Sequence, residues 1–191
     1  AEAEIRSEGV LMTLLLIAEH DNQNLKPSTL NTITAALKMA GDIHVLVAGD
    51  NCIPVSEAAK KISGIAKVIV ANDPAYKNFL AENLAPLVAK LAPSYSHVVA
   101  PASTFGKNLI PRAAALGDAQ AVSDVVDVVA ADTFVRPIYA GNALATVKSS
   151  DKIIFIKYEF WVNYLNEIQK RNIECYLVSA VFKNHHPFFK W

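Results

Sequence analysis

The sequence has few cysteines, few glycines and no excess of charge. It contains two cysteines, seven glycines, and 18 basic against 18 acidic residues in a chain of 191. Cys52 and Cys175 form no Cys-x-x-Cys pair, so we expect a reducing compartment and no cysteine-based metal site. The balanced charge leaves no electrostatic footprint for nucleic acid or for an anionic membrane, and neither is expected as a partner.

Long hydrophobic runs are also missing. The longest apolar run near the start, LLLIA at 14–18, has the length of a strand and is too short to span a bilayer. The first nine residues, AEAEIRSEG, are acidic, lack an initiator Met and match neither a signal peptide nor a transit peptide. We therefore expect no membrane span and no visible targeting segment, in a chain that is processed, trimmed or incomplete at its start.

Hydrophobic residues make up 52% of the sequence and fall into short runs that alternate with helix-like segments. The predicted strands cover residues 10–18, 43–49, 66–71 and 97–100. The predicted helices cover residues 27–40, 54–62, 79–91 and the stretch from the 101–107 turn to 116. Pro86 falls inside the third helix and should kink or split it. Strands that alternate with helices through short connections predict a parallel sheet with helices on both faces.

After Gly117 the pattern changes to strand-like runs without helices between them. These runs cover residues 121–129, 134–139, 143–148 and 153–157. We predict a β-meander, partly antiparallel, that extends the edge of the parallel sheet. The last stretch, 158–191, is crowded with aromatic residues, and we expect a helix near 161–168 and a strand over 176–182. The chain thus divides into an α/β domain at 1–157 and an atypical tail.

The turn after the fourth predicted strand is the best candidate for a ligand or anion site. It brings Ser103, Thr104 and Lys107 to the start of a helix, where free backbone N–H groups favour a phosphate. The alternative is that Ser103 or Thr104 caps the helix and Lys107 is solvated. The turn is not a Walker loop, because Pro101 replaces the first Gly and Asn108 replaces the Ser or Thr that would hold magnesium.

No catalytic or metal-binding constellation emerges elsewhere in the sequence. The first strand is not followed by Gly-x-Gly-x-x-Gly, which argues against an NAD-binding Rossmann domain. The five histidines lack a nucleophile or ligand partner, and the adjacent His185 and His186 make only a two-residue site. Arg136, Tyr139 and Asn142 lie around a Pro and a Gly between two β-rich runs, and Arg and Tyr often anchor protein interfaces. We interpret these three as interface residues rather than catalytic ones.

One group of motifs runs continuously from about residue 14 to residue 156. It begins with VLMTLLLIAEHDN, KPSTLNTITAALKMAG, IHVLVAGDN and GIAKVIVA. Its most specific stretches are STFGKNLIPRAAA, AVSDVVDV and DTFVRPIYAGNALATVKS. Together these motifs resemble the N-terminal domain of the electron transfer flavoprotein alpha subunit family.

The resemblance implies a three-layer Rossmann-like fold of the adenine-nucleotide alpha-hydrolase type, with a mostly parallel sheet. It also implies a heterodimer of alpha and beta subunits that is an electron carrier rather than an enzyme. In this family, electrons pass from acyl-CoA and other flavin dehydrogenases to a membrane-bound quinone oxidoreductase, during fatty-acid and amino-acid oxidation. The implied location is the mitochondrial matrix in a eukaryote and the cytoplasm in a bacterium.

The resemblance places the redox FAD mainly in the C-terminal domain of the alpha subunit and the structural AMP in the beta subunit. Nothing in the tail resembles the FAD motifs, and no flavin-contacting residue can be carried over. We therefore expect a truncated or alternatively ended alpha subunit that keeps the scaffold and docking domain and does not bind FAD alone. On this hypothesis, surfaces shared with the beta subunit or the second domain lie near Lys107, Arg112, Arg136, Tyr139 and Asn142.

Two other hypotheses remain open. The first is a stand-alone adenine-nucleotide-binding module that uses the turn from Ser103 to Lys107. The second is a pure interaction domain, which would be detected only by its co-purification with a beta subunit.

Overall fold

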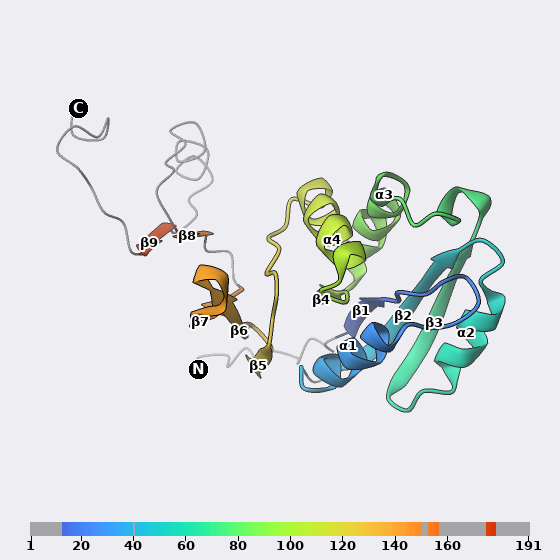
Figure 1. Ribbon diagram of the computed structural model, residues 1–191, viewed down its shortest axis with the longest axis horizontal. Helices are drawn as coiled ribbons and strands as arrows, with labels where there is room; N and C mark the ends of the chain where they lie inside the picture. Colours follow the sequence, from blue (N-terminus) through green and yellow to red (C-terminus); the bar gives the residue numbers. More distant parts are fainter. Residues whose placement is uncertain (1–12, 40, 150–152, 157–174, 179–191) are drawn as a thin grey trace, which may run out of the picture. The chain divides into compact units, whose positions relative to one another are not determined.

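The computed structural model describes residues 13–39, 41–149, 153–156 and 175–178. The chain divides between Val147 and Lys148 into two compact units, and each unit is described by itself. The first unit holds a four-stranded sheet, its helices and a three-stranded sheet, and the second holds a two-stranded sheet (Figure 1). Among the described residues, no helix is long and apolar enough to cross a bilayer.

The four-stranded sheet is parallel and has the order β3-β2-β1-β4. Its strands are β1 (Thr13–Ile17), β2 (Asp42–Gly49), β3 (Ile65–Asn72) and β4 (His97–Val99). The apolar run at the start of the chain forms β1, which lies between β2 and β4. Its residues Leu14, Leu15 and Leu16 are 0% exposed. The predicted parallel sheet is therefore confirmed, with its most apolar run in the interior, as burial on two faces requires.

Helices cover both faces of this sheet, as predicted. They are α1 (Pro27–Leu37), α2 (Ile53–Lys60), α3 (Ala81–Leu91) and α4 (Thr104–Leu116). Leu14 and Leu16 share one hydrophobic cluster with residues of α1 and α2, whereas Leu15 and Ile17 share another with residues of α3 and α4. Because successive strand residues point to opposite faces, this alternation builds the three layers. Short 3-10 turns flank α3, namely η1 (Pro74–Tyr76) and η2 (Ala92–Ser94).

Two details of the helices differ from the prediction. The apolar spacing in α1 predicted the helix correctly, but Leu30 and Leu37 are about half exposed and only Ile33 of the three is buried. The buried stripe includes Thr29 instead, because its Oγ1 accepts a hydrogen bond from the Glu19 N–H (2.8 Å) and donates one to the Glu19 carbonyl (2.9 Å). Pro86 does not split α3, and it lies on the exposed side, where water can satisfy the carbonyl that loses its donor.

The meander forms, but as a sheet of its own. Its strands are β5 (Asp127–Ala130), β6 (Thr133–Ile138) and β7 (Ala143–Lys148), in the order β5-β6-β7, and the turn η3 (Tyr139–Gly141) precedes β7. The ladder between β5 and β6 is antiparallel. The expectation that these strands extend the edge of the parallel sheet is wrong, because they hydrogen-bond to one another and not to β4.

The fourth predicted strand of the meander belongs to the second unit. There β8 (Ile153–Ile156) pairs in parallel with β9 (Cys175–Val178), and Ile153 lies opposite Cys175. The strand predicted at 176–182 therefore overlaps β9. The helix predicted near 161–168 and the pair His185 and His186 lie outside the described residues.

The three-stranded sheet is attached to the rest of the first unit by apolar packing, to which Phe134 contributes an aromatic ring, and by two nearby ion pairs. Phe134 on β6 is 7% exposed and belongs to the same hydrophobic cluster as α1 and α2. Its ring meets that of His97 edge-on, with centroids 6.3 Å apart. The ion pairs join Lys38 to Asp127 (3.1 Å) and Lys107 to Asp124 (2.8 Å).

A close approach between α4 and the end of β4 generates a stability prediction. A Cβ at Gly106 would collide with the backbone carbonyl oxygen of Pro101. Gly106→Ala should therefore lower the free energy of unfolding by roughly 1–3 kcal/mol, although alanine is the better helix former. The measurement is urea denaturation of the 191-residue chain, followed by circular dichroism.

Gly117→Ala is the matched control, since a Cβ there would meet the carbonyl oxygens of Ala113 at 3.4 Å and Ala114 at 3.8 Å without a collision. This change should alter the free energy of unfolding by less than about 0.5 kcal/mol. Equal destabilisation by the two substitutions would contradict the steric explanation.

Candidate functional site

The switch point of the sheet lies between β1 and β4. The chain leaves β1 toward α1 on one face and leaves β4 toward α4 on the other. In open parallel sheets, ligands bind outside the carboxyl ends of the strands at such a point. The turn predicted as an anion site begins α4 here, with Ser103 at the N-cap and Thr104 as the first helical residue.

The Ser103 side chain does not cap α4. Its Oγ is buried and has no hydrogen-bond partner among the described residues. It lies near enough to the Glu19 carboxylate to affect that group's pKa, although no hydrogen bond of ordinary geometry joins them. The predicted alternative of a simple serine cap is therefore wrong, and Thr104 is exposed to solvent.

Glu19 places a buried carboxylate at the switch point. Its side chain is 9% exposed, Oε1 accepts a hydrogen bond from Lys26 Nζ (3.0 Å), and Oε2 accepts one from Ser28 Oγ (2.8 Å). Burial works to raise the pKa of Glu19, but the nearby hydroxyls of Ser103 and Ser28 and the Lys26 ammonium outweigh it and lower the pKa. A carboxylate held ionised at this place repels a phosphate rather than attracting one.

The basic residues of α4 are already engaged in ion pairs. Lys107 Nζ lies 2.8 Å from Asp124 Oδ1, and Arg112 Nη1 lies 3.1 Å from Glu82 Oε1 on α3. Both cations therefore connect elements of the fold, and neither adds a free charge for an anion. The structure brings Ser103, Thr104 and Lys107 together on the first turn of α4, while Arg112 faces α3.

A second group of residues, missed in the sequence, connects the loops at the same end of the sheet. Asn22 donates from Nδ2 to the Lys77 carbonyl (3.1 Å), accepts at Oδ1 from the Asp50 N–H (3.0 Å), and donates its own N–H to His20 Nδ1 (3.0 Å). Its φ of 72° is a conformation that asparagine adopts more readily than most residues. The only sequence signal was therefore an Asn at a turn, which does not identify its partners.

Arg136, Tyr139 and Asn142 lie on β6 and the following turn and are not brought to the switch point. Arg136 donates from Nη2 to Ser123 Oγ (2.8 Å). Its Nε is buried without a hydrogen-bond partner among the described residues. Tyr139 is 55% exposed with a φ of 50°, and its carbonyl accepts the N–H of Asn142 (3.2 Å).

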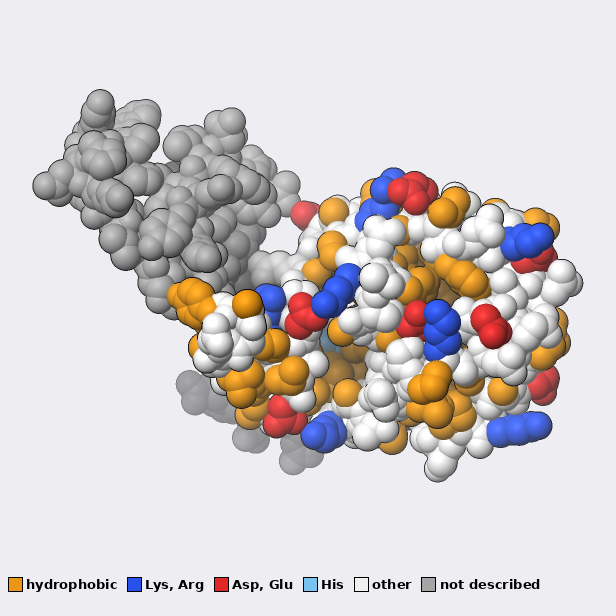
Figure 2. All heavy atoms as spheres, viewed as in Figure 1, with side chains coloured by type: hydrophobic (Ala, Val, Ile, Leu, Met, Phe, Trp, Pro, Cys, Tyr) orange, Lys and Arg blue, Asp and Glu red, His pale blue; other side chains and the backbone are white. Residues whose placement is uncertain are grey.

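The outer face of the three-stranded sheet carries aliphatic side chains, which we call the aliphatic face. Alternation sends Val128 and Val147 toward the core, where they pack against the cluster of α1 and α2. It sends Val129 (63% exposed) and Leu144 (67% exposed) outward, and Val126, which immediately precedes β5, is 60% exposed. Figure 2 shows hydrophobic side chains gathered over this sheet.

Comparison with known proteins identifies the family. The family model for the electron transfer flavoprotein domain matches residues 14–157. The electron transfer flavoprotein subunit alpha of Pseudomonas aeruginosa is 58% identical over 139 residues, which are 73% of this chain and 45% of that protein. The mitochondrial subunit alpha of Dictyostelium discoideum is 47% identical over 156 residues, which are 78% of this chain and 44% of that protein.

The subunit alpha of Paracoccus denitrificans is 49% identical over 140 residues, covering 73% of this chain and 46% of that protein. The chain thus spans somewhat under half the length of the curated relatives it matches. The parallel sheet, its helices and the three-stranded sheet all lie within the matched residues, and the chain belongs to the electron transfer flavoprotein family.

Proposed function

We propose that this chain is part of an electron transfer flavoprotein alpha subunit, and that its residues 1–157 are the scaffold and subunit-docking domain. The assembled protein would carry electrons from acyl-CoA and other flavin dehydrogenases to a quinone oxidoreductase, as a carrier rather than an enzyme. The names of three similar proteins and the matched residues support this proposal. The end of that match at 157 supports the boundary with a separate tail at 158–191.

The cellular compartment that we propose depends on the kind of organism from which the chain comes. Relatives named as mitochondrial occur beside a bacterial one, so the proposal covers both cases. We assign the mitochondrial matrix to a eukaryotic protein and the cytoplasm to a bacterial one.

The observation that carries the docking role is the aliphatic face of β5, β6 and β7. Val126, Val129 and Leu144 are each at least 60% exposed, whereas Leu14, Leu15 and Leu16 of β1 are fully buried. Contiguous apolar side chains in water favour association with a complementary surface. Arg136 lies on β6, and Tyr139 and Asn142 lie on the turn that connects β6 to β7. We assign this face to the beta subunit.

A substitution on the aliphatic face should weaken assembly. Leu144→Ser and Val129→Ser each remove apolar contact area from the exposed face and leave no cavity in the core. Each should raise the dissociation constant for a beta subunit of the same source by about tenfold, the effect of losing about 1.4 kcal/mol. Titration by isothermal calorimetry or biolayer interferometry measures the change.

Leu37→Ser is the matched control, because Leu37 is 52% exposed on α1 and its side chain lies beside Gly64, outside the aliphatic face. It should leave the dissociation constant unchanged. Equal weakening by Leu37→Ser, or no weakening by the two face substitutions, would contradict the assignment of this surface.

On this proposal, the redox flavin is bound by residues outside the α/β domain. At the switch point of the sheet, Glu19 is buried and its carboxylate is held ionised. The purified chain mixed with FAD should therefore emerge from gel filtration without flavin absorbance. Stoichiometric flavin that stays with the protein would overturn this part of the proposal.

The competing assignment is a stand-alone adenine-nucleotide module at the turn from Ser103 to Lys107. Its position at the switch point favours it, whereas the Lys107–Asp124 ion pair and the Glu19 carboxylate oppose it. Calorimetry with millimolar AMP or ATP should therefore detect no binding. Binding that weakens in Lys107→Ala would favour the nucleotide module instead.

A further inference from the structure

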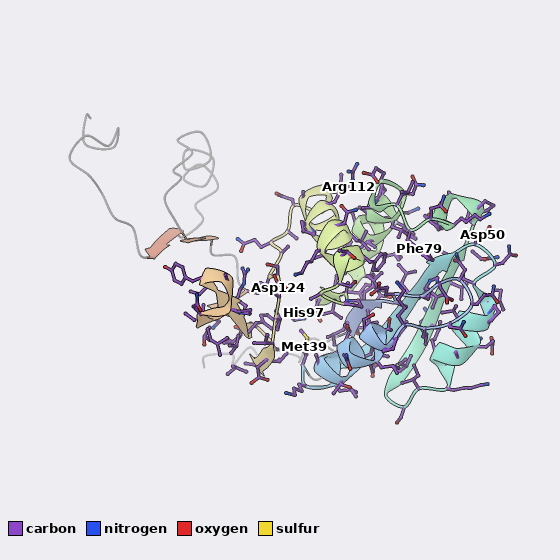
Figure 3. All side chains as sticks on the ribbon, in the orientation of Figure 1. Met39, Asp50, Phe79, His97, Arg112 and Asp124 are labelled. Atoms are coloured by element: carbon purple, nitrogen blue, oxygen red, sulfur yellow. The ribbon has the colours of Figure 1, made fainter. Side chains whose placement is uncertain are left out.

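The loops that follow β1, β2 and β3 meet at one small cluster, which we call the loop junction. It consists of His20, Asn22, Gly49 and Phe79, and Figure 3 marks Asp50 and Phe79 at this end of the sheet. The hydrogen bonds of Asn22 reach Asp50 in the loop after β2 and Lys77 in the segment after β3. The junction therefore holds three neighbouring loops in one arrangement.

The His20 ring occupies the centre of the loop junction. His20 is 3% exposed, and its ring meets Phe79 edge-on with centroids 5.0 Å apart. Phe79 in turn meets Phe105 of α4 edge-on at 6.4 Å. A Cβ at Gly49 would lie 2.8 Å from His20 Cε1, so only glycine leaves room for the ring. The imidazole is thus enclosed by all three loops and connected through Phe79 to α4.

The hydrogen bond to His20 fixes its neutral form. Nδ1 lies 3.0 Å from the Asn22 nitrogen, whose N–H can only donate, so Nδ1 must accept. The single proton of the neutral ring therefore lies on Nε2, which is buried and has no hydrogen-bond partner among the described residues. A second proton would have to bind Nδ1. There it would face the Asn22 N–H, and two donors cannot share a hydrogen bond.

Protonation would also place a charge inside this cluster. Burial lowers the pKa of His20, while the nearby Ala48 carbonyl and Asp21 act to raise it and Lys26 acts to lower it. The other charged residues of the loops that surround the ring are Glu19, Asp50, Asp73 and Lys77. Since the pKa of His20 is lowered from 6.5 in the folded chain, the unfolded chain binds more protons below that pH. The stability that neutral His20 contributes is complete above about pH 6.5 and is lost as the pH falls.

We propose that His20 is a proton-sensitive latch of the loop junction. In its neutral form the ring accepts the Asn22 N–H and holds the loops after β1, β2 and β3 together. Protonation breaks that bond, releases Asn22 from its contacts with Asp50 and Lys77, and loosens the three loops. The latch acts at the carboxyl end of the parallel sheet and does not depend on the partner assigned to the aliphatic face.

Hydrogen exchange of the full 191-residue chain tests the latch. The amides of Asn22 and Asp50 report it directly, because each donates a hydrogen bond within the junction. After correction for intrinsic exchange, their protection should fall by up to about tenfold per pH unit between pH 6.5 and 5. Amides of β1, which belong to the core, should keep their protection over this range.

His20→Asn is the decisive variant, since Asn Oδ1 can take the place of Nδ1 as an acceptor but cannot be protonated. In this variant, the protection of the Asn22 and Asp50 amides from hydrogen exchange should become independent of pH. His97→Asn is the matched control, because His97 is also a partly buried histidine whose pKa burial lowers, but it lies outside the junction. It should leave the pH dependence at Asn22 and Asp50 as in the unsubstituted chain.

A second measurement keeps the proposal testable should His20→Asn fail to fold. Nitrogen-15 NMR of the unsubstituted chain at pH 8 should show the proton of His20 on Nε2 and none on Nδ1. A neutral ring protonated at Nδ1 would overturn the proposal. An unchanged pH dependence of protection in a folded His20→Asn variant would overturn it as well.

Discussion

The burial of β1 on both faces is the constraint on which the rest of the first unit depends. Leu14, Leu15 and Leu16 are fully buried, and alternate residues face opposite helix layers. Burying one such side chain stabilises a fold by about 1.5–3 kcal/mol relative to its exposure. A shift of register by one residue would exchange the two sets of side chains between the layers, so the pairing with β2 and β4 is strongly specified.

The same central position determines what happens at the carboxyl end of the sheet. The chain must turn from β1 to α1 within a few residues, and Glu19 does this by binding Thr29 with its backbone and Lys26 and Ser28 with its carboxylate. The backbone and carboxylate groups of Glu19, which could otherwise contact a ligand at the switch point, thus bind residues of the connection from β1 to α1. This use of the switch point supports the scaffold and docking role proposed for the domain.

Sequence reasoning succeeded where a pattern was local. The apolar runs identified all four parallel strands, and the loss of helices after Gly117 predicted β6 and β7 closely. The strand predicted over 121–129 overlaps β5 only at its end, because residues 121–126 form no strand. Sequence reasoning predicted α1 itself but not the buried face of α1, where Thr29, which is hydrogen-bonded to Glu19, is buried and Leu30 is exposed. Spacing alone also could not show that the meander would form a separate sheet, because strand pairing depends on contacts distant in sequence.

The sequence predicted where the candidate site lies but not the charges that surround it. Strand, polar turn and helix start were enough to place Ser103 and Lys107 at the switch point. The partner of Lys107 is Asp124, and the carboxylate near Ser103 is that of Glu19, which is far away in the sequence. His20 resembled an ordinary buried histidine, since its acceptor role follows from the turn at Asn22 and not from its neighbours in the chain.

The attachment of the three-stranded sheet has a consequence for ionic strength. Lys38 belongs to the α1 side of the parallel sheet and Lys107 to the α4 side, so their ion pairs hold the small sheet from two directions. All four side chains are at least 39% exposed. Such pairs contribute about 0–1 kcal/mol each and are screened by salt. Added electrolyte therefore weakens the two ion pairs without detaching the sheet, which remains held by the apolar packing of Phe134, Val128 and Val147.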